Sequence, residues 1–358
     1  MIETYPRAWI EVGSRVVPYQ YLLSALVDNT LYMAADSAEL EFSNDRLLSD
    51  YFRKLQEVKV WMGHVTNPDR WSRDELAHVF TGQVDGVLPR FANGMTCRLM
   101  CRDYSAQLID SQFTGSVQNV TTSELATLLF QRRGLNPIVT PTDTPVPEEL
   151  VHDQKEWSVL QRMAERDGFV CYVDKDRNGY YGPRKAEDEA PIATIRYGTE
   201  GANITADGIE FDDSKVDVPN RVIVRHYLGR TKGYVEAVAE DTDLINRYGV
   251  IQRIIHDPLA TDQATAQRIA DNKLRLYKRG AVTANGTVIG NPLMRAEAKV
   301  QAEGFGRFSG PYYLDRVRHR FNKGEGYVCQ LTMVNLRPEN QFQYRDDLTQ
   351  DTGRTTTP

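Results

Sequence analysis

Apolar and polar residues alternate with a period of two over most of residues 8–104. Such alternation is typical of β-strands that bury one face. Residues 8–12 and 15–19 flank the turn residues Gly13 and Ser14 and predict a hairpin, and residues 38–44 predict a further strand. The first block of the chain is therefore predicted to be mainly β.

A short helix is predicted to interrupt these strands. Asn44 or Asp45 can cap its N-terminus. Apolar residues then recur at helical spacing, at Leu47, Leu48, Tyr51, Phe52 and Leu55.

Residues 111–205 have a different pattern. Thr121 and Glu124 have the spacing of a capping box, and Gly134 can end the helix that follows. A second helix is predicted from about residue 155 to 167, ending at Gly168, and residues 169–173 and 179–181 predict a hairpin. This segment is predicted to be a small α/β domain.

The β pattern returns at residues 208–211 and 221–224, breaks for a helical stretch at 261–279, and resumes from 282 to 336. Residues 338–358 hold few apolar groups, so they bury too little surface to offset the entropy of ordering them. We expect a polar arm or a disordered tail there.

Two parts of the sequence share an order of residues. The first set lies at residues 57–60, Gly63, residues 80–82 and residues 94–99. Similar residues follow in the same order at residues 297–300, Gly304, residues 308–310 and residues 326–331. Each set describes a strand, a glycine turn, a long strand and a closing strand with an inward Cys and Leu. Chance likeness among strands is one interpretation, and a duplicated β domain is the one we favour.

Composition and charge exclude several classes of protein. A chain of 358 residues is long enough for about two domains. The net charge of −6 disfavours a protein that grips nucleic acid or anionic lipid, since both need excess positive charge. No apolar run is long enough to span a bilayer, and the first residues lack the pattern of a signal peptide. The four cysteines, Cys97, Cys101, Cys171 and Cys329, show neither disulfide nor zinc spacing and are expected to be buried thiols.

Two motifs resemble ligand loops without meeting their requirements. The acidic residues of 174–179 imitate a calcium loop, but its twelfth position is Lys185 where a bidentate Glu is needed, so a hairpin turn without metal is expected. Residues 304–310 are rich in glycine but lack dinucleotide-binding spacing and a following helix, so a turn between strands is expected.

Catalytic constellations are absent from the sequence pattern. The histidines have no metal-ligand spacing, and His226 and His319 alternate with strand residues, which favours packed β histidines. No nucleophile motif or nameable acid/base pair stands out, so no catalytic residue, cofactor or metal ligand is assigned. Arg316, Arg318 and Arg320 alternate along one strand face, either as a solvated surface or as a subunit interface.

The residues around these arginines resemble a known family. Residues 286–293, 298–300, 304–321 and 326–331 resemble the phage late control protein D family of tail baseplate hub proteins, and are similar to the hub part of type VI secretion spike proteins. The resemblance extends through residues 157–174 and covers about 150–337, with the first 110 residues similar only in layout. One turn departs from it, because Glu297-Ala298 stands where the family often has Gly-Asp.

The resemblance implies an α+β, mainly β fold with two similar tail-tube-like β-barrels. The divisions expected are a first barrel at 1–110, a small α/β domain at 111–205, a second barrel at 206–235 and 283–337, a helical insertion at 236–282 and an arm at 338–358. Three chains would form a ring that is threefold overall and nearly sixfold at its barrels. The internal order of residues described above is what such a fold would leave in a sequence.

The function implied is structural: a baseplate hub of a phage tail or a derived contractile injection particle, adapting a sixfold tail tube to a threefold spike. Its expected partners are two further copies of itself, the tail tube protein, a central spike on a separate chain, the tape measure protein and baseplate wedge proteins. Neither sequence-specific nucleic acid binding nor stable membrane insertion is expected. The expected location is the tail baseplate, assembled in the cytoplasm of a bacterial host.

The alternative function is a tail-associated cell-wall hydrolase that uses a pair of carboxylates. The sequence offers no particular pair for that role.

Overall fold

The computed structural model describes residues 4–31, 34–113, 119–143, 145–146, 154–185, 189–198, 200–214, 218–229, 233–258, 260–279 and 282–336. The arm expected at 338–358 lies outside these residues, so that prediction is untested.

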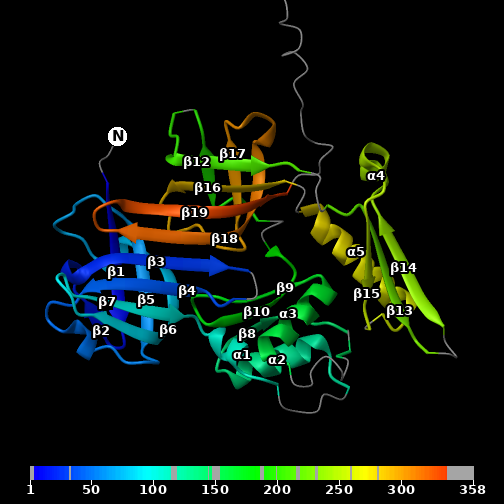
Figure 1. Ribbon diagram of the computed structural model, residues 1–358, viewed down its shortest axis with the longest axis horizontal. Coiled ribbons are helices and arrows are strands. Elements are labelled where there is room, and N and C mark those ends of the chain that lie inside the picture. The colour runs from blue at the N-terminus through cyan, green and yellow to red at the C-terminus, as the bar shows by residue number, and fades with distance from the viewer. Residues whose placement is uncertain are drawn as a thin grey trace, which may run out of the picture.

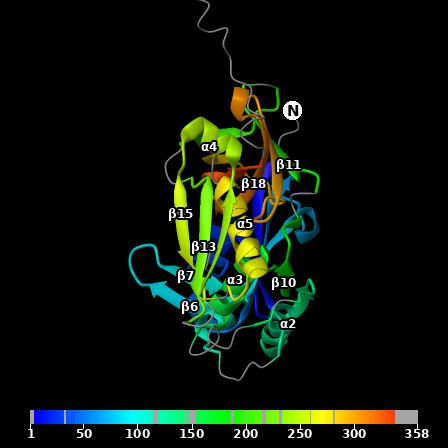
Figure 2. The same ribbon diagram turned by 90° about the vertical axis from the view of Figure 1, so that its right-hand side faces the viewer.

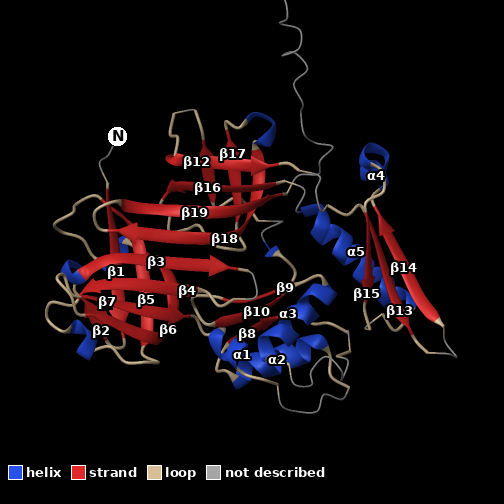
Figure 3. Ribbon diagram, viewed as in Figure 1, coloured by secondary structure: helices blue, strands red, loops and turns tan. Residues whose placement is uncertain are grey.

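A single large sheet dominates the described part of the chain (Figures 1 and 3). Its thirteen strands divide into two β-units. The first β-unit contains β1 (Tyr5–Val12), β2 (Arg15–Val17), β3 (Leu22–Thr30), β4 (Ser37–Ser43), β5 (Glu57–Val65), β6 (Ala77–Arg90) and β7 (Thr96–Arg102). The second contains β11 (Ala193–Arg196), β12 (Ile204–Asp212), β16 (Thr283–Ile289), β17 (Lys299–Glu303), β18 (Gly310–Asn322) and β19 (Gly326–Asn335).

The two β-units have the same pairing order. Strands pair as β5-β6-β7-β4-β3 in the first and as β17-β18-β19-β16-β12 in the second. In each unit the long strand pairs through its first part with one neighbour and through its later part with the other. The similar residue order in the two halves of the sequence therefore corresponds to equivalent strands, and the predicted mainly β, α+β fold is confirmed.

Strand β3 joins the units by pairing with β18, antiparallel, from Arg316↔Thr30 to Asn322↔Ser24. The ladders consequently run as one open path from β12 to β2 through the described residues. Apolar side chains of both units meet in one core, with Val27, Leu40, Val317 and Phe321 among its buried members.

A small α/β module follows β7. It contains α1 (Ala106–Asp110), α2 (Thr122–Arg132), α3 (Glu156–Asp167), β8 (Asn136–Val139), β9 (Val170–Val173) and β10 (Asn178–Gly182). Thr121 and Glu124 form the predicted capping box, and Gly168 ends α3 in the left-handed region at φ 72°. The expected helices and hairpin are confirmed.

A second module contains β13 (Arg221–Tyr227), β14 (Tyr234–Glu240), α4 (Thr242–Tyr248), β15 (Gln252–His256) and α5 (Gln263–Arg279). Helix α5 lies between this three-stranded sheet and the rest of the chain, and in Figure 2 the sheet lies in front, toward the viewer. Buried residues of α5 and β13, such as Ile269 and Val224, share a core with α2 and α3 of the α/β module. None of the described helices is both long and apolar enough to cross a membrane.

Three local expectations differ from the structure. The strands within residues 206–235 belong to two different sheets, because β12 lies in the large sheet whereas β13 packs on α5. Alternation of apolar and polar residues does not determine which sheet a strand joins. Residues 236–282 hold two strands as well as helices, and β11 leaves the 111–205 segment to pair with β17. The division into domains itself stays a prediction.

The helix expected after Asn44 is a single 3-10 turn, Leu48–Asp50. Leu47 and Leu55 adopt the left-handed region, at φ 52° and 66°, which a continuous right-handed helix excludes. The Asn44 side chain accepts a hydrogen bond from the Ser49 N–H within this turn.

Candidate functional site

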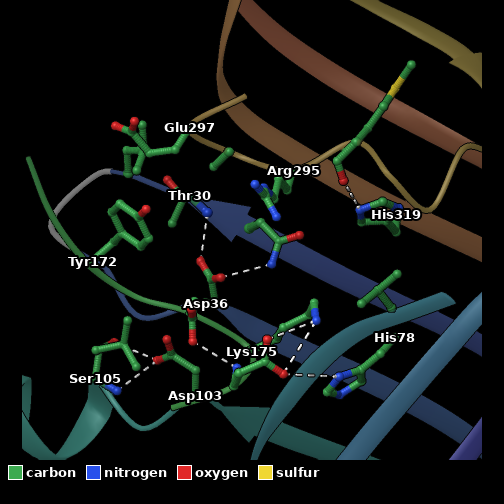
Figure 4. Close-up of a pocket in the computed structure, with 18 of the residues that line it drawn as sticks. Thr30, Asp36, His78, Asp103, Ser105, Tyr172, Lys175, Arg295, Glu297 and His319 are labelled. Carbon is green, nitrogen blue, oxygen red and sulfur yellow. Dashed lines mark hydrogen bonds and ion pairs between the residues drawn. The ribbon is translucent and has the colours of Figure 1, made fainter. Parts of the chain in front are cut away.

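A cavity of about 470 Å³ lies where three parts of the chain meet (Figure 4). Its walls come from the first β-unit, from the β9–β10 turn of the α/β module and from residues 292–297 before β17. Asn29, Thr30 and Leu31 reach it because they end β3, the strand that joins the two β-units. The cavity therefore depends on the relative positions of all three parts.

Two carboxyl groups, those of Asp36 and Asp103, face this cavity. Asp36 accepts hydrogen bonds from the Thr30 N–H at 2.8 Å and the Asn29 Nδ2 at 2.9 Å. Asp103 accepts from the N–H and hydroxyl of Ser105, and its own N–H donates to the Asp36 carbonyl at 2.8 Å. Both carboxyl groups are thus held by neutral donors.

Burial changes the acidity of this pair. Loss of hydration, with a smaller contribution from the charge of Asp28, raises the pKa of Asp36 to about 7. Burial, followed by the charge of Asp36, raises the pKa of Asp103 well above its ordinary value. The two groups interact, so they titrate as a pair.

Charged groups of the β9–β10 turn form another part of the lining. Lys175 Nζ lies 3.1 Å from Asp176 Oδ2, and His78 Nδ1 lies 3.9 Å from Asp176 Oδ1. Burial, and then the positive charge of Lys175, lower the pKa of His78. The charged side chains in this part of the lining therefore have partners among themselves.

The turn at residues 174–179 is the expected hairpin turn. Asp174 Oδ1 accepts from the N–H groups of Asp176 and Asn178, and Asp174 Oδ2 accepts from Asn178 Nδ2. Its carboxylate oxygens therefore hold the turn. Among the described residues, no group of three or more His, Cys, Asp or Glu side chains has the arrangement of a metal site.

Trp157 and Glu297 also line the cavity, and each has a buried polar atom without a hydrogen-bond partner among the described residues. The Nε1 atom of Trp157, whose side chain is 4% exposed, has no hydrogen-bond partner among the described residues. Glu297 Oε1 lies 3.6 Å from Arg184 Nη1. Glu297 also adopts φ 66°, so this turn keeps a left-handed backbone at the position where the resembling family often has glycine.

The three arginines of β18 have partners within the chain. Arg316 donates from Nε to Asp28 Oδ1 at 2.8 Å, and Arg318 donates from Nε to Asp28 Oδ2 at 2.9 Å. Burial alone would raise the pKa of Asp28, but the hydrogen bonds from both arginines outweigh it and lower that pKa. Arg320 lies 3.3 Å from Glu325, and both side chains are more than half exposed. The structure places the three residues on one strand but does not test them as a subunit interface.

His319 is a packed β histidine, as its pattern predicts. Its ring is fully buried, with Nδ1 2.7 Å from the Tyr327 hydroxyl and Nε2 2.9 Å from the Met294 carbonyl. Burial lowers the pKa of His319 to about 4. Cys97, Cys101, Cys171 and Cys329 are buried free thiols, which confirms that expectation.

The sequence did not single out Asp36, Asp103 or Trp157. Both aspartates stand beside the ends of strands, where carboxylates are common, and Trp157 has the spacing of a core residue on α3. Only the folded chain brings them to one cavity.

Comparison with known proteins gives a family and a fold. A family model described as YQBQ-like matches residues 77–334. No curated protein matches the chain.

Solved structures of phage tail proteins are similar over almost the whole chain. The 43 kDa tail protein of prophage MuSo2 from Shewanella oneidensis is 17% identical, with a TM-score of 0.72, covering 92% of this chain and 98% of that one. A tail protein from Neisseria meningitidis MC58 is 15% identical, with a TM-score of 0.73, covering 93% and 97%.

An E. coli protein described as a type VI secretion system component, similar in structure to the bacteriophage T4 tail proteins gp27 and gp5, is 12% identical. Its TM-score is 0.57, covering 94% of this chain and 78% of that one. The resemblance to tail hub proteins is confirmed at the level of the fold.

Replacing Asp28 by Asn should lower the free energy of unfolding by about 2 kcal/mol, because two guanidinium groups lose their shared carboxylate. The matched change Glu325→Gln should have almost no effect, since the Arg320 pair is exposed. Urea denaturation of both variants measures this. Equal effects of the two substitutions would mean that the ion pairs of Asp28 add no stability to the contact between β3 and β18.

The difference in unfolding free energy between the wild type and His319→Gln should shrink as pH falls from 6.5 to 4. Unfolded histidine takes up a proton near pH 6.5, whereas folded His319 stays neutral until about pH 4, so its contribution is present above pH 6.5 and is lost as pH falls. The full loss corresponds to about 3 kcal/mol. Denaturation across this range, with exposed His256→Gln as control, checks it; a constant difference would contradict it.

Proposed function

We propose, from the premise that this chain belongs to the YQBQ-like family, that it is a structural hub protein of a phage tail baseplate or of a phage-derived contractile injection particle. Its fold, which matches tail proteins over nearly their entire length, supports this role. In the proposed mechanism the protein adapts symmetry and seals a conduit, without bond-making chemistry.

The observation that carries the proposal is the repeat of one strand order in two β-units of one chain. Three such chains in a closed ring would present six similar units on one face and remain threefold overall. A sixfold tail tube could then bind one face, while a threefold spike on a separate chain binds the other. The tape measure protein and baseplate wedge proteins complete the proposed set of partners.

The proposed site of action is the tail baseplate, after assembly in the cytoplasm of a bacterial host. A net charge of −6 suits a conduit for DNA, because a wall with excess positive charge would retain the nucleic acid.

We infer that β18 contributes to contacts between chains through its arginine face. Arg316 and Arg318 are already bound to Asp28, so substituting them would disturb the fold as well as any interface. Arg320 is the better probe, since its side chain is 53% exposed and its partner Glu325 is exposed too.

Mass photometry of the protein should detect a trimer of about 122 kDa from chains of 40.7 kDa, and a mass larger by that of the spike when the spike is bound. Arg320→Glu should weaken assembly about tenfold or more by placing like charges in the contact, whereas Arg46→Glu, an exposed charge reversal outside β18, should not. A dimer or a ring of six chains would contradict the proposed ring. Equal assembly of the two variants would remove Arg320 from the interface.

A second candidate function, a cell-wall hydrolase, is favoured by one observation. Asp36 and Asp103 are two interacting carboxyl groups in one cavity, and burial raises the pKa of each. Glycoside hydrolysis uses such a pair, one member as acid and the other as nucleophile or base.

We expect no soluble fragments to be released from purified peptidoglycan, because both carboxyl groups are engaged by hydrogen bonds within the chain. Chromatography of the soluble fraction measures this. Turnover that is lost in Asp103→Asn but kept in exposed Asp69→Asn would favour the hydrolase.

A further inference from the structure

The second half of β6 has an open edge. Residues 77–83 of β6 pair with β5, and residues 83–90 pair with β7. Backbone hydrogen bonds with Leu55 and Gln56 extend the contact on the β5 side as far as Val84. On that side, no strand of the described chain pairs with residues 85–90, and in Figure 2 this end of the β6–β7 hairpin projects from the molecule.

Strand β6 is equivalent to β18 of the second β-unit residue by residue. Each strand has a register shift against the strand that follows it, at Asp85 in β6 and at Asp315 in β18. Counted from this shift, four positions carry identical residues: Asp85, Val87, Arg90 and Phe91 in β6, and Asp315, Val317, Arg320 and Phe321 in β18. The edge of β18 therefore shows what can cover the edge of β6.

Within the chain, β3 covers the edge of β18. The ladder pairs residues 316–322 of β18 with residues 24–30 of β3, on the side of β18 away from β19. Phe321 lies in this ladder and is 1% exposed, whereas its equivalent Phe91 is 65% exposed. Phe91 thus occupies a core position of the repeated structure without a strand beside it.

The strand equivalent to β3 is β12, and it has an open edge of its own. Asp28 of β3 and Asp212 of β12 stand at equivalent positions, because their partners on β4 and β16 align through the strands that carry Cys97 and Cys329. Strand β12 begins the ladder path and pairs only with β16 in the part of the chain that the structure describes. One chain therefore has both halves of a second contact of the β3–β18 kind.

We propose that β12 of one copy pairs, antiparallel, with residues 86–92 of a second copy and so repeats the β3–β18 ladder between chains. This inference rests on the proposed ring and names the surfaces through which its chains meet. The equivalent register sets three pairs opposite one another: Arg90 and Glu210, Phe91 and Ile209, and Pro89 and Phe211. Ile209 and Phe211 already pack against the shared core, so Phe91 would be buried on the same face.

Charge complementarity supports this register. Arg90 and Glu210 are both exposed, and neither has an ion-pair partner among the described residues. Opposite charges on directly opposed residues stabilise paired strands. The ion pairs of Asp28 are not repeated, because Leu88 stands where β18 has Arg318. The contact between chains is therefore expected to be weaker than the contact within the chain.

A second copy is the occupant because the two open edges lie far apart within one chain. Six strands separate β12 from β6 along the ladder path, and Figure 1 shows β12 at the top of the large sheet and β6 near the bottom. Neighbouring strands are about 4.8 Å apart. Each copy offers one edge of each kind, so the contact is head-to-tail, and such a contact closes into a ring or continues as a filament.

The test is disulfide formation between opposed positions. The full chain carrying Arg90→Cys/Glu210→Cys is oxidised with copper(II)-phenanthroline and separated by non-reducing electrophoresis. Directly opposed residues of antiparallel strands have Cα atoms about 4.5–5.5 Å apart, which is within disulfide range. Bands of two and three chains are expected, and reduction should remove them. The natural cysteines are buried and stay in place.

Three control variants define the contact. Leu26→Cys/Arg320→Cys, the equivalent pair within the chain, should form a disulfide and remain a single chain. The exposed Arg46→Cys combined with Glu210→Cys should give no multimer. Arg90→Cys alone should not crosslink, and a dimer from it would refute the proposal, because two β6 edges would then meet in a twofold contact.

Phe91→Ser probes the apolar part of the contact. It should weaken assembly tenfold or more in sedimentation velocity and leave the unfolding midpoint unchanged, since the side chain is 65% exposed in the single chain. Leu128→Ser, at a side chain of α2 that is 53% exposed, should leave assembly unchanged. Equal assembly of the two variants would count against burial of Phe91.

Sedimentation velocity of the unoxidised samples, at the same protein concentration, separates this proposal from the ring itself. A trimer without disulfides between chains in Arg90→Cys/Glu210→Cys would overturn the strand pairing and leave the ring standing. Crosslinked ladders longer than three chains would support the pairing and contradict the threefold ring. Single chains alone in both measurements would overturn both.

Discussion

Hydrogen bonds between β3 and β18, two strands almost 300 residues apart in the chain, join the two β-units. Without this ladder each unit would leave a strand edge open, and an open edge is a surface for pairing with other chains. Asp28 strengthens the contact between these two strands, because its carboxylate on β3 binds two guanidinium groups on β18. The apolar side chains beneath the ladder form one core, so the two units have a shared interior.

The pairing of β3 with β18 also determines where the cavity is. The residues that end β3 form one wall, and residues 292–297 of the second unit form another. Strand β9 and the turn after it close the space from the α/β module, so three segments distant in sequence contribute to one site. Polar groups in such a junction lose water, and this loss is the main cause of the raised pKa values of Asp36 and Asp103 and the lowered pKa of His319.

The buried polar groups of the cavity lining differ in how completely they are paired. His319 has a partner at each ring nitrogen and stays neutral, which suits a structural role within the second β-unit. Asp36 and Asp103 accept hydrogen bonds from neutral donors and have no cation at ion-pair distance among the described residues. Buried groups left in that condition are uncommon, because folding normally pairs them.

The sequence by itself determined the local elements and the existence of two similar β-units. Period-two alternation marked the strands, Thr121 with Glu124 marked the start of α2, and Gly168 marked the end of α3. These signals are local, since they depend on neighbours within a few residues. The tertiary structure alone decided that β13 leaves the large sheet, that β3 pairs with β18, and that Asp28 binds Arg316 and Arg318. Asp36, Asp103 and Trp157 became a candidate site for the same reason: their meeting depends on packing between distant segments, and no spacing along the chain encodes it.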